Sequence, residues 1–192
     1  TEPYDNFDEV YTQLGKYAGM YHFERWQWSA SSLQFYVDNA IDAWDNGSLV
    51  TAGFVSNDPP KTGTTIEDLD KTNPNRDIEA CNIFWNTWVD DFAGYLQDLE
   101  DEGVTVLFRP LHEPENRAWI KYSSKQSFRN VWQQLFEELC VTRELNNLLW
   151  VFCLERDMNT GWYPGDDYVD IVGVDLYKSA PYDSEDFEDL IW

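Results

Sequence analysis

The sequence predicts an α/β fold and, within that class, part of a (β/α)8 TIM barrel. Segments patterned like buried strands alternate with segments of helical apolar spacing, which indicates parallel strands joined by right-handed crossovers. Polar side chains follow several different strands, as they do at the mouth of a barrel. A dinucleotide-binding sheet is not expected, because the chain has no GxGxxG or P-loop motif.

The N-terminal part of the chain predicts two strands and two helices. An opening helix is expected at about residues 7–16, and a first strand follows at about residues 19–23. Apolar residues at helical spacing predict a helix over residues 29–44, which Asp45-Asn46-Gly47 ends. Residues 49–55 predict the next strand, and a long polar loop follows it.

The remaining chain continues the alternation. We predict strands over residues 104–109, 147–153 and 168–174, and helices over residues 78–102 and 127–141 and from Asp183 onward. The strand at 104–109 does not alternate apolar with polar residues, so we expect both its faces to be buried. It should end at Pro110, because proline cannot donate to a sheet ladder.

The predicted strands are fewer than a complete barrel needs. Five are expected here, whereas a barrel has eight and typically about 250 residues. We therefore predict one domain over residues 1–192, a truncated barrel with about strands 2 to 6 present. No signal peptide is visible, and we expect targeting information to be missing rather than absent.

The composition excludes some partners and favours others. Thirty-six acidic and 13 basic side chains give a net charge of −23, which argues against nucleic acid and anionic membranes as partners. No apolar run approaches 18 residues, so no transmembrane helix is expected. The 10 Trp, 11 Tyr and 11 Phe suit a sugar ligand, whose C–H faces stack on aromatic rings. The alternative is a large aromatic core.

Cysteine and histidine usage predicts neither a metal nor a cofactor. The cysteines are Cys81, Cys140 and Cys153, an odd number without the spacing of a disulfide framework or a zinc site. We expect Cys140 and Cys153 to be buried thiols, with one disulfide as the alternative. Only two histidines, His22 and His112, are available as metal ligands.

Chemistry-bearing residues are densest after the strand at 104–109. Arg109, His112 and Glu113 lie at its carboxyl end, where barrels place their active sites. A carboxyl group beside a histidine and an arginine indicates a general acid/base, and the alternative is a buried ion pair that closes the strand. Other polar pairs that follow predicted strands are Glu24-Arg25, Asn57-Asp58, Glu155-Arg156 and Asp175-Tyr177.

The stretch Arg109-Pro110-Leu111-His112-Glu113, followed by Trp119, resembles the acid/base motif of family 26 glycoside hydrolases, the β-mannanase family. The resemblance continues through residues 145–151 and 162–177. It is best over residues 100–180 and looser over residues 17–60. It implies a secreted barrel that hydrolyses β-linked plant polysaccharides with retention of configuration. Mannan is the usual substrate, and β-1,3-xylan and mixed-linkage glucan are minority ones.

The resemblance also implies roles for individual residues. Glu113 would be the general acid/base, which His112 supports. Arg109 would hold carboxylates in place through its fork of donors. Asp175 would support the site, and the hydroxyl of Tyr177 would bond the nucleophile.

Two tryptophans carry expectations about sugar binding. By the resemblance, Trp119 would form a sugar platform beside the acid, and Trp162 would be a subsite aromatic. The alternative for both rings is ordinary loop packing, since tryptophan is also a frequent core residue.

The sequence departs from the family in three places. Pro114–Tyr122 replaces a Met-Asn-Gly and an aromatic cluster, and Phe54-Val55 stands where the family commonly has Trp-His. No residue matches the nucleophile, a glutamate on the seventh strand, so we expect it beyond the C-terminus. Residues 1–192 alone should then be inactive, because a retaining enzyme needs both carboxyl groups about 5–5.5 Å apart.

Two other hypotheses stay open. Glu155, after the strand that follows Glu113, could serve as a substitute carboxylate, because the ends of adjacent parallel strands lie close together. The chain could also be a non-catalytic carbohydrate-binding relict that keeps Trp119, Trp162 and Tyr177 as stacking surfaces.

Overall fold

A computed structural model of the protein describes residues 11–24, 30–54, 57–155 and 160–175. Five parallel strands form one sheet whose spatial order equals their order in the chain. They are β1 (Met20–Glu24), β2 (Leu49–Phe54), β3 (Val106–Pro110), β4 (Leu148–Glu155) and β5 (Ile171–Asp175). A doubly wound sheet would reverse its order at a switch point, so this sheet is instead an arc of a barrel, as predicted.

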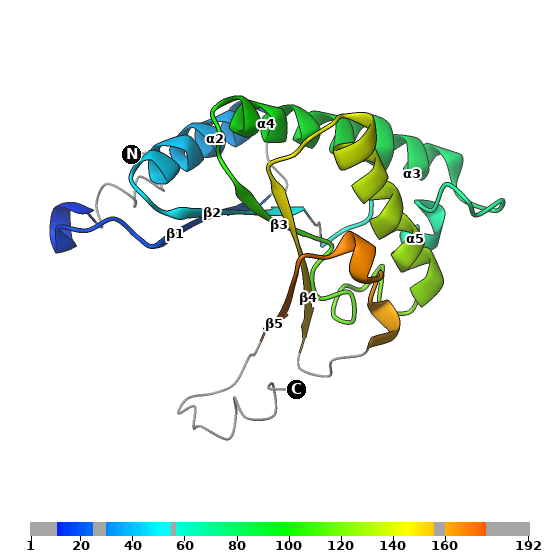
Figure 1. Ribbon diagram of the computed structural model, residues 1–192. Coiled ribbons are helices and arrows are strands. Elements are labelled where there is room, and N and C mark those ends of the chain that lie inside the picture. Colours follow the sequence, from blue (N-terminus) through cyan, green and yellow to red (C-terminus); the bar gives the residue numbers. More distant parts are fainter. Residues whose placement is uncertain (1–10, 25–29, 55–56, 156–159, 176–192) are drawn as a thin grey trace, which may run out of the picture.

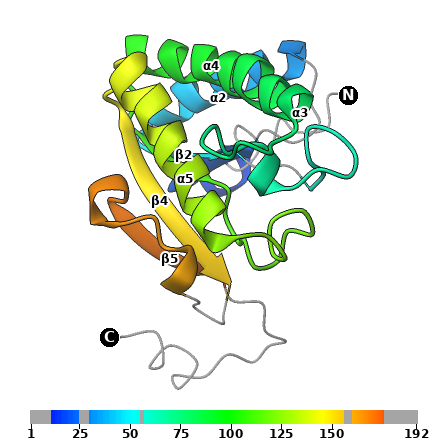
Figure 2. The same ribbon diagram turned by 90° about the vertical axis from the view of Figure 1, so that its right-hand side faces the viewer.

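The helices cover one side of this arc. They are α2 (Ala30–Asp45), α3 (Ile78–Ile83), α4 (Asp90–Asp101) and α5 (Lys125–Phe136). A π-helical segment at Phe84–Val89 joins α3 to α4, and another at Glu137–Thr142 extends α5. The two long helices predicted at 78–102 and 127–141 are therefore confirmed, each with a π-helical stretch. Figures 1 and 2 show the helices on the convex side of the curved sheet.

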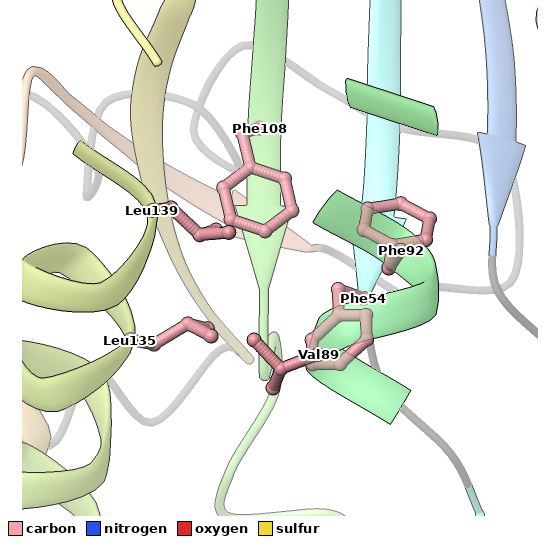
Figure 3. A pocket seen from close by; sticks show the side chains of 6 residues that line it. All are labelled: Phe54, Val89, Phe92, Phe108, Leu135 and Leu139. Atoms are coloured by element: carbon pink, nitrogen blue, oxygen red, sulfur yellow. The ribbon is translucent and has the colours of Figure 1, made fainter. Parts of the chain in front are cut away.

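Aromatic side chains fill the layer between the sheet and the helices. Phe54 and Phe108 point from the sheet toward Phe92 of α4 and Leu135 of α5 (Figure 3). With Val89 and Leu139 they line a narrow apolar gap that has no room for a water molecule. A dry gap lined only by apolar groups is part of the core and not a ligand site.

The concave side of the sheet is open within the described part of the chain. Leu49 and Leu149 on this side are 52% and 38% exposed, whereas Val50 and Trp150 on the convex side are fully or almost fully buried. The prediction that the strand at 104–109 is buried on both faces is wrong for this side, since Leu107 and Arg109 are only half-buried. The physical reason is that helices cover only the convex face.

Several predicted boundaries shift or cannot be placed. The last strand begins at Ile171 instead of residue 168, because Asp166–Tyr168 forms a 3-10 turn. Asp170 then bonds the backbone of Trp150 in both directions, with its N–H as donor and its carboxylate as acceptor. Of the opening helix only residues 11–14 are described, and they are helical. The helix expected from Asp183 lies outside the described residues.

The remaining sequence expectations concern thiols and membranes. All three cysteines are free thiols, so the disulfide alternative is not realised in this structure. Cys153 is buried as expected, and Cys140 is half-buried. Among the described helices, none combines the length and apolarity needed to cross a bilayer.

Asp70 anchors the long β2–α3 loop to α5. This buried carboxylate accepts hydrogen bonds from both the backbone and the hydroxyl of Thr72, and from the amides of Asn130 and Gln134. Burial alone would raise the pKa of Asp70, but these donors outweigh it and hold the pKa below its usual value.

Replacing Asp70 with asparagine is expected to lower the unfolding free energy at neutral pH by about 1–3 kcal/mol, because buried donors lose an ionised acceptor. A depressed folded-state pKa stabilises the fold above the unfolded pKa of about 3.9, and this contribution is lost as pH falls through the folded value. Thermal melts of both proteins should therefore converge at acidic pH. Asp98→Asn, at an exposed position of α4, is the control and should change little at any pH.

Candidate active site

The carboxyl ends of the strands bring the predicted polar residues to one edge of the sheet. Glu24 ends β1 and is in register with Gly53 of β2, which pairs in turn with Arg109 of β3. Glu155 ends β4 opposite Asp175 of β5. Parallel strands place all these ends on the same side, so the expected mouth of the arc is confirmed.

Glu113 sits on a strained backbone just beyond β3. Leu111 and Glu113 have φ angles of 49° and 52°, in the left-handed region that costs a non-glycine residue about 1–3 kcal/mol. Two bonds hold this path. The N–H of Leu111 donates to Phe54 O of β2, and the N–H of Glu113 donates to Cys153 O of β4, each at 2.9 Å. The neighbouring strands therefore fix the position of the carboxyl group.

The Glu113 side chain is buried beside a cation. Its residue is 4% exposed, and Nη2 of Arg117, four residues later, lies 4.0 Å from its carboxylate. The alternative interpretation of Glu113 was a buried ion pair that closes the strand. The structure does place a cation beside Glu113, but that cation is Arg117 of the following loop, which the sequence analysis did not single out. An ion pair and an acid/base role are compatible, because active sites commonly combine buried carboxylates with a nearby charge.

Arg109 and Asp175 meet across β4. Nη1 of Arg109 donates to both carboxylate oxygens of Asp175, at 3.0 and 3.2 Å. The guanidinium therefore contacts a carboxylate through one nitrogen, whereas the family resemblance implied its fork of donors. Cys153 lies between them, with its Sγ 3.9 Å from Nη1. Burial, together with the nearby Asp175 carboxylate, raises the pKa of the Cys153 thiol to about 12, so the thiol stays protonated.

His112 is a neutral member of the site. Its Nε2 lies 2.6 Å from Nη2 of Arg117, and its Nδ1 lies 3.6 Å from Oε1 of Glu24. Burial, with the positive charges of Arg109 and Arg117, lowers the pKa of His112 to about 3. At ordinary pH the imidazole therefore carries no charge, and its polar contacts are with Arg117 and Glu24.

The two tryptophans lie in the core. Trp119 is 5% exposed and Trp162 is 2% exposed. Phe128 packs edge-on against Trp162 with ring centroids 5.3 Å apart, and Lys125 Nζ lies 5.5 Å from the Trp162 ring centre. A ring stacks on a sugar only through an open face, so this conformation favours ordinary packing over the sugar-binding role for both. Tyr177 lies outside the described residues.

Sequence reasoning missed Arg117 and Glu115. Glu115 Oε1 accepts the backbone N–H of Glu155, which ties the segment after Glu113 to the end of β4. Burial, with the carboxylates of Glu155 and Glu113 nearby, raises the pKa of Glu115. Both residues fall in the stretch that departs from the family motif. The spacing of Arg117 four residues after Glu113 was not a usable signal, because the segment between them is not helical.

Comparison with known proteins identifies the family. The family model for glycosyl hydrolase family 26 matches residues 3–192. The chain belongs to this family. Among curated proteins, the family-26 chain is 33% identical over 165 residues to mannan endo-1,4-beta-mannosidase A and B of Caldalkalibacillus mannanilyticus, covering 76% of this chain and 32% of that protein. It is 31% identical to a Bacillus subtilis mannan endo-1,4-beta-mannosidase, covering 77% and 45%.

Solved structures of family members share the fold. The structure of GH26A from Muricauda sp. matches with a TM-score of 0.77 at 26% identity, over 98% of this chain and 68% of that one. A β-mannanase from a termite symbiotic protist, solved with a gluco-manno-oligosaccharide, matches with a TM-score of 0.76 at 26% identity, over 90% and 59%. The family-26 chain thus spans less than half the length of the two curated relatives and corresponds to part of a barrel.

Proposed function

We propose that this family-26 chain is the acid/base half of a retaining endo-β-1,4-mannanase. The observation that carries the proposal is Glu113, a buried carboxyl group held on a strained backbone at the carboxyl end of β3. Mannan as the substrate is supported by the names of the relatives. A polymeric substrate cannot enter a cell, which supports secretion.

In the proposed reaction, Glu113 first donates its proton to the glycosidic oxygen as the bond to the anomeric carbon breaks. A second carboxylate attacks that carbon and forms a covalent glycosyl intermediate. Glu113, now ionised, then removes a proton from water, whose oxygen displaces the second carboxylate and restores both groups. We propose that this second carboxylate lies beyond residue 192, where the family resemblance puts it.

Two alternatives make different predictions. Glu155 is the candidate for a second carboxylate within the described residues, and it ends the strand next to β3. A non-catalytic sugar-binding protein would use Trp119 and Trp162 as stacking surfaces, and their burial removes this support.

The test compares two proteins on β-1,4-mannan, glucomannan, β-1,3-xylan and mixed-linkage glucan. One is residues 1–192, and the other is the encoded protein with whatever residues follow Trp192. We expect the second protein to cleave mannan with retention, read from the anomer first released by NMR, and the first to release no sugar. Hydrolysis by residues 1–192 would place the nucleophile inside them. Hydrolysis of none of the four glycans by either protein would contradict the proposed activity.

A further inference from the structure

Buried polar atoms that lack a hydrogen-bond partner gather at the candidate active site. Among the described residues there are seven such side-chain atoms, and five of them lie around the carboxyl ends of the strands. These five are Glu24 Oε1, Arg109 Nε, His112 Nδ1, Glu115 Oε2 and Arg117 Nε. Buried polar groups in folded proteins nearly always have a hydrogen-bond partner. A cluster of buried polar atoms without partners therefore indicates residues that have a functional role in addition to a structural one.

Arg117 connects three parts of this region. Its Nη2 lies 2.6 Å from His112 Nε2 and 4.0 Å from the Glu113 carboxylate. Its Nη1 donates to Asn57 Oδ1 at 2.6 Å, in the loop after β2. The Arg117 side chain is 15% exposed. Its contacts with the buried His112 and Glu113 are shielded from water, whereas its contact with Asn57 is exposed. The guanidinium therefore links the loop after β3 to the loop after β2.

The contact with Arg117 fixes where the proton of His112 sits. A guanidinium has only donors and stays charged, so His112 Nε2 has to be the acceptor. The proton of the neutral imidazole is then on Nδ1, and Nδ1 faces Oε1 of Glu24 at 3.6 Å. Glycine at position 53 makes room for this carboxylate, because a Cβ there would lie 2.9 Å from Glu24 Cγ.

We infer that Arg117 is a positioning residue that holds His112 as the neutral Nδ1–H tautomer, aimed at Glu24, beside Glu113. The relevance of this arrangement to catalysis rests on the proposed function. The tautomer itself does not depend on that function, so the two can fail separately. Arg117 stands in the stretch Pro114–Tyr122, which departs from the family motif.

Several charged or titratable groups surround the imidazole and determine its protonation. They are Glu24, His22, Arg109, Arg117 and Asp175. Burial and the two arginines disfavour the imidazolium, and Asp175 opposes them. Removing Arg117 takes away a positive charge and the donor to Nε2 together. Both the tautomer balance and the pH at which His112 gains a proton should then change.

The experiment reads His112 directly by long-range ¹H–¹⁵N NMR of the imidazole rings. The chain has only two histidines, and His112→Gln assigns the signals. In the wild type we expect the Nδ1–H tautomer and no titration of His112 between about pH 5 and 8. In Arg117→Met we expect mixed tautomers and a titration midpoint at least about one pH unit higher. Arg117→Lys, which keeps a charged donor, should restore most of the wild-type behaviour.

Arg143→Met is the matched control, since Arg143 is also half-buried and pairs with Asp90 and Glu138 away from the site. It should leave both histidines unchanged. An Nε2–H tautomer in the wild type would overturn the inference, and that spectrum needs no variant to fold. Identical spectra for Arg117→Met and the wild type would also overturn it. Mannan hydrolysis tests only the proposed function. Its loss would not affect the inference about the His112 tautomer, because the spectra are recorded without substrate.

Discussion

Replacing Glu113 with glutamine is expected to lower the rate of mannan hydrolysis by about 10²–10⁴-fold, the usual contribution of general acid–base catalysis. Glutamine keeps the size of the side chain but cannot donate the proton that the leaving oxygen needs. The measurement is kcat on β-1,4-mannan with the longest encoded form of the protein. Circular dichroism should show that the variant keeps the fold of the wild type.

The leaving group distinguishes an acid from a nucleophile. The dinitrophenolate of a dinitrophenyl glycoside is a good leaving group that needs no proton. Glu113→Gln should therefore form the glycosyl intermediate from this substrate at a nearly normal rate. Turnover should then be limited by the second step, because no base activates water, and added azide should restore it. Equal loss on both substrates would contradict the acid/base role.

Glu155→Gln and Glu115→Gln are the matched controls, because both carboxylates lie near Glu113 at the same edge of the sheet. If the nucleophile lies outside the chain, neither variant should approach the loss seen for Glu113→Gln. A comparable loss in Glu155→Gln would instead favour Glu155 as the second carboxylate.

Replacing Phe108 with alanine is expected to lower the free energy of unfolding by about 3–5 kcal/mol. Phe108 is fully buried, stacks on Phe92 with ring centroids 6.1 Å apart and meets Trp150 edge-on at 5.0 Å. It also borders the narrow apolar gap of Figure 3. The variant would enlarge that gap into a cavity whose walls belong to both the sheet and the helices, so it cannot easily collapse.

Urea unfolding followed by tryptophan fluorescence measures this loss. The control is Tyr122→Ala, because Tyr122 is 84% exposed and truncating it should change stability by no more than about 0.5 kcal/mol. If Phe108→Ala and Tyr122→Ala unfold at the same urea concentration, Phe108 does not hold the helical layer to the sheet.

Local patterns in the sequence were enough to predict the repeating architecture. The apolar run at 104–109 and the helical spacing at 29–44 both correspond to observed elements, β3 and α2. Their boundaries shifted where tertiary contacts intervened. The start of β5 moved to Ile171 because Asp170 bonds the backbone of Trp150. Periodicity indicates which face of an element is apolar. It does not indicate which distant backbone group will form hydrogen bonds with the residue at the end of the element.

The two tryptophans show the limit of motif reasoning about a binding site. Trp119 and Trp162 were expected at the sugar, and the structure packs both into the core. Their spacing from the motif resembles that of the family, but exposure depends on the neighbours that surround a ring. Lys125 and Phe128, both of α5, contact the Trp162 ring. No pattern in the sequence around residue 162 predicts these contacts.

The sequence by itself determined the alternation of strands and helices and the position of Glu113 after a buried strand that ends at a proline. Both follow from local steric rules that act over a few residues. Only the tertiary structure decided which side chains meet there. Arg109 reaches Asp175 66 positions away, and Arg117 reaches Asn57 60 positions away. Such contacts depend on the register and curvature of the sheet, which no short stretch of sequence encodes.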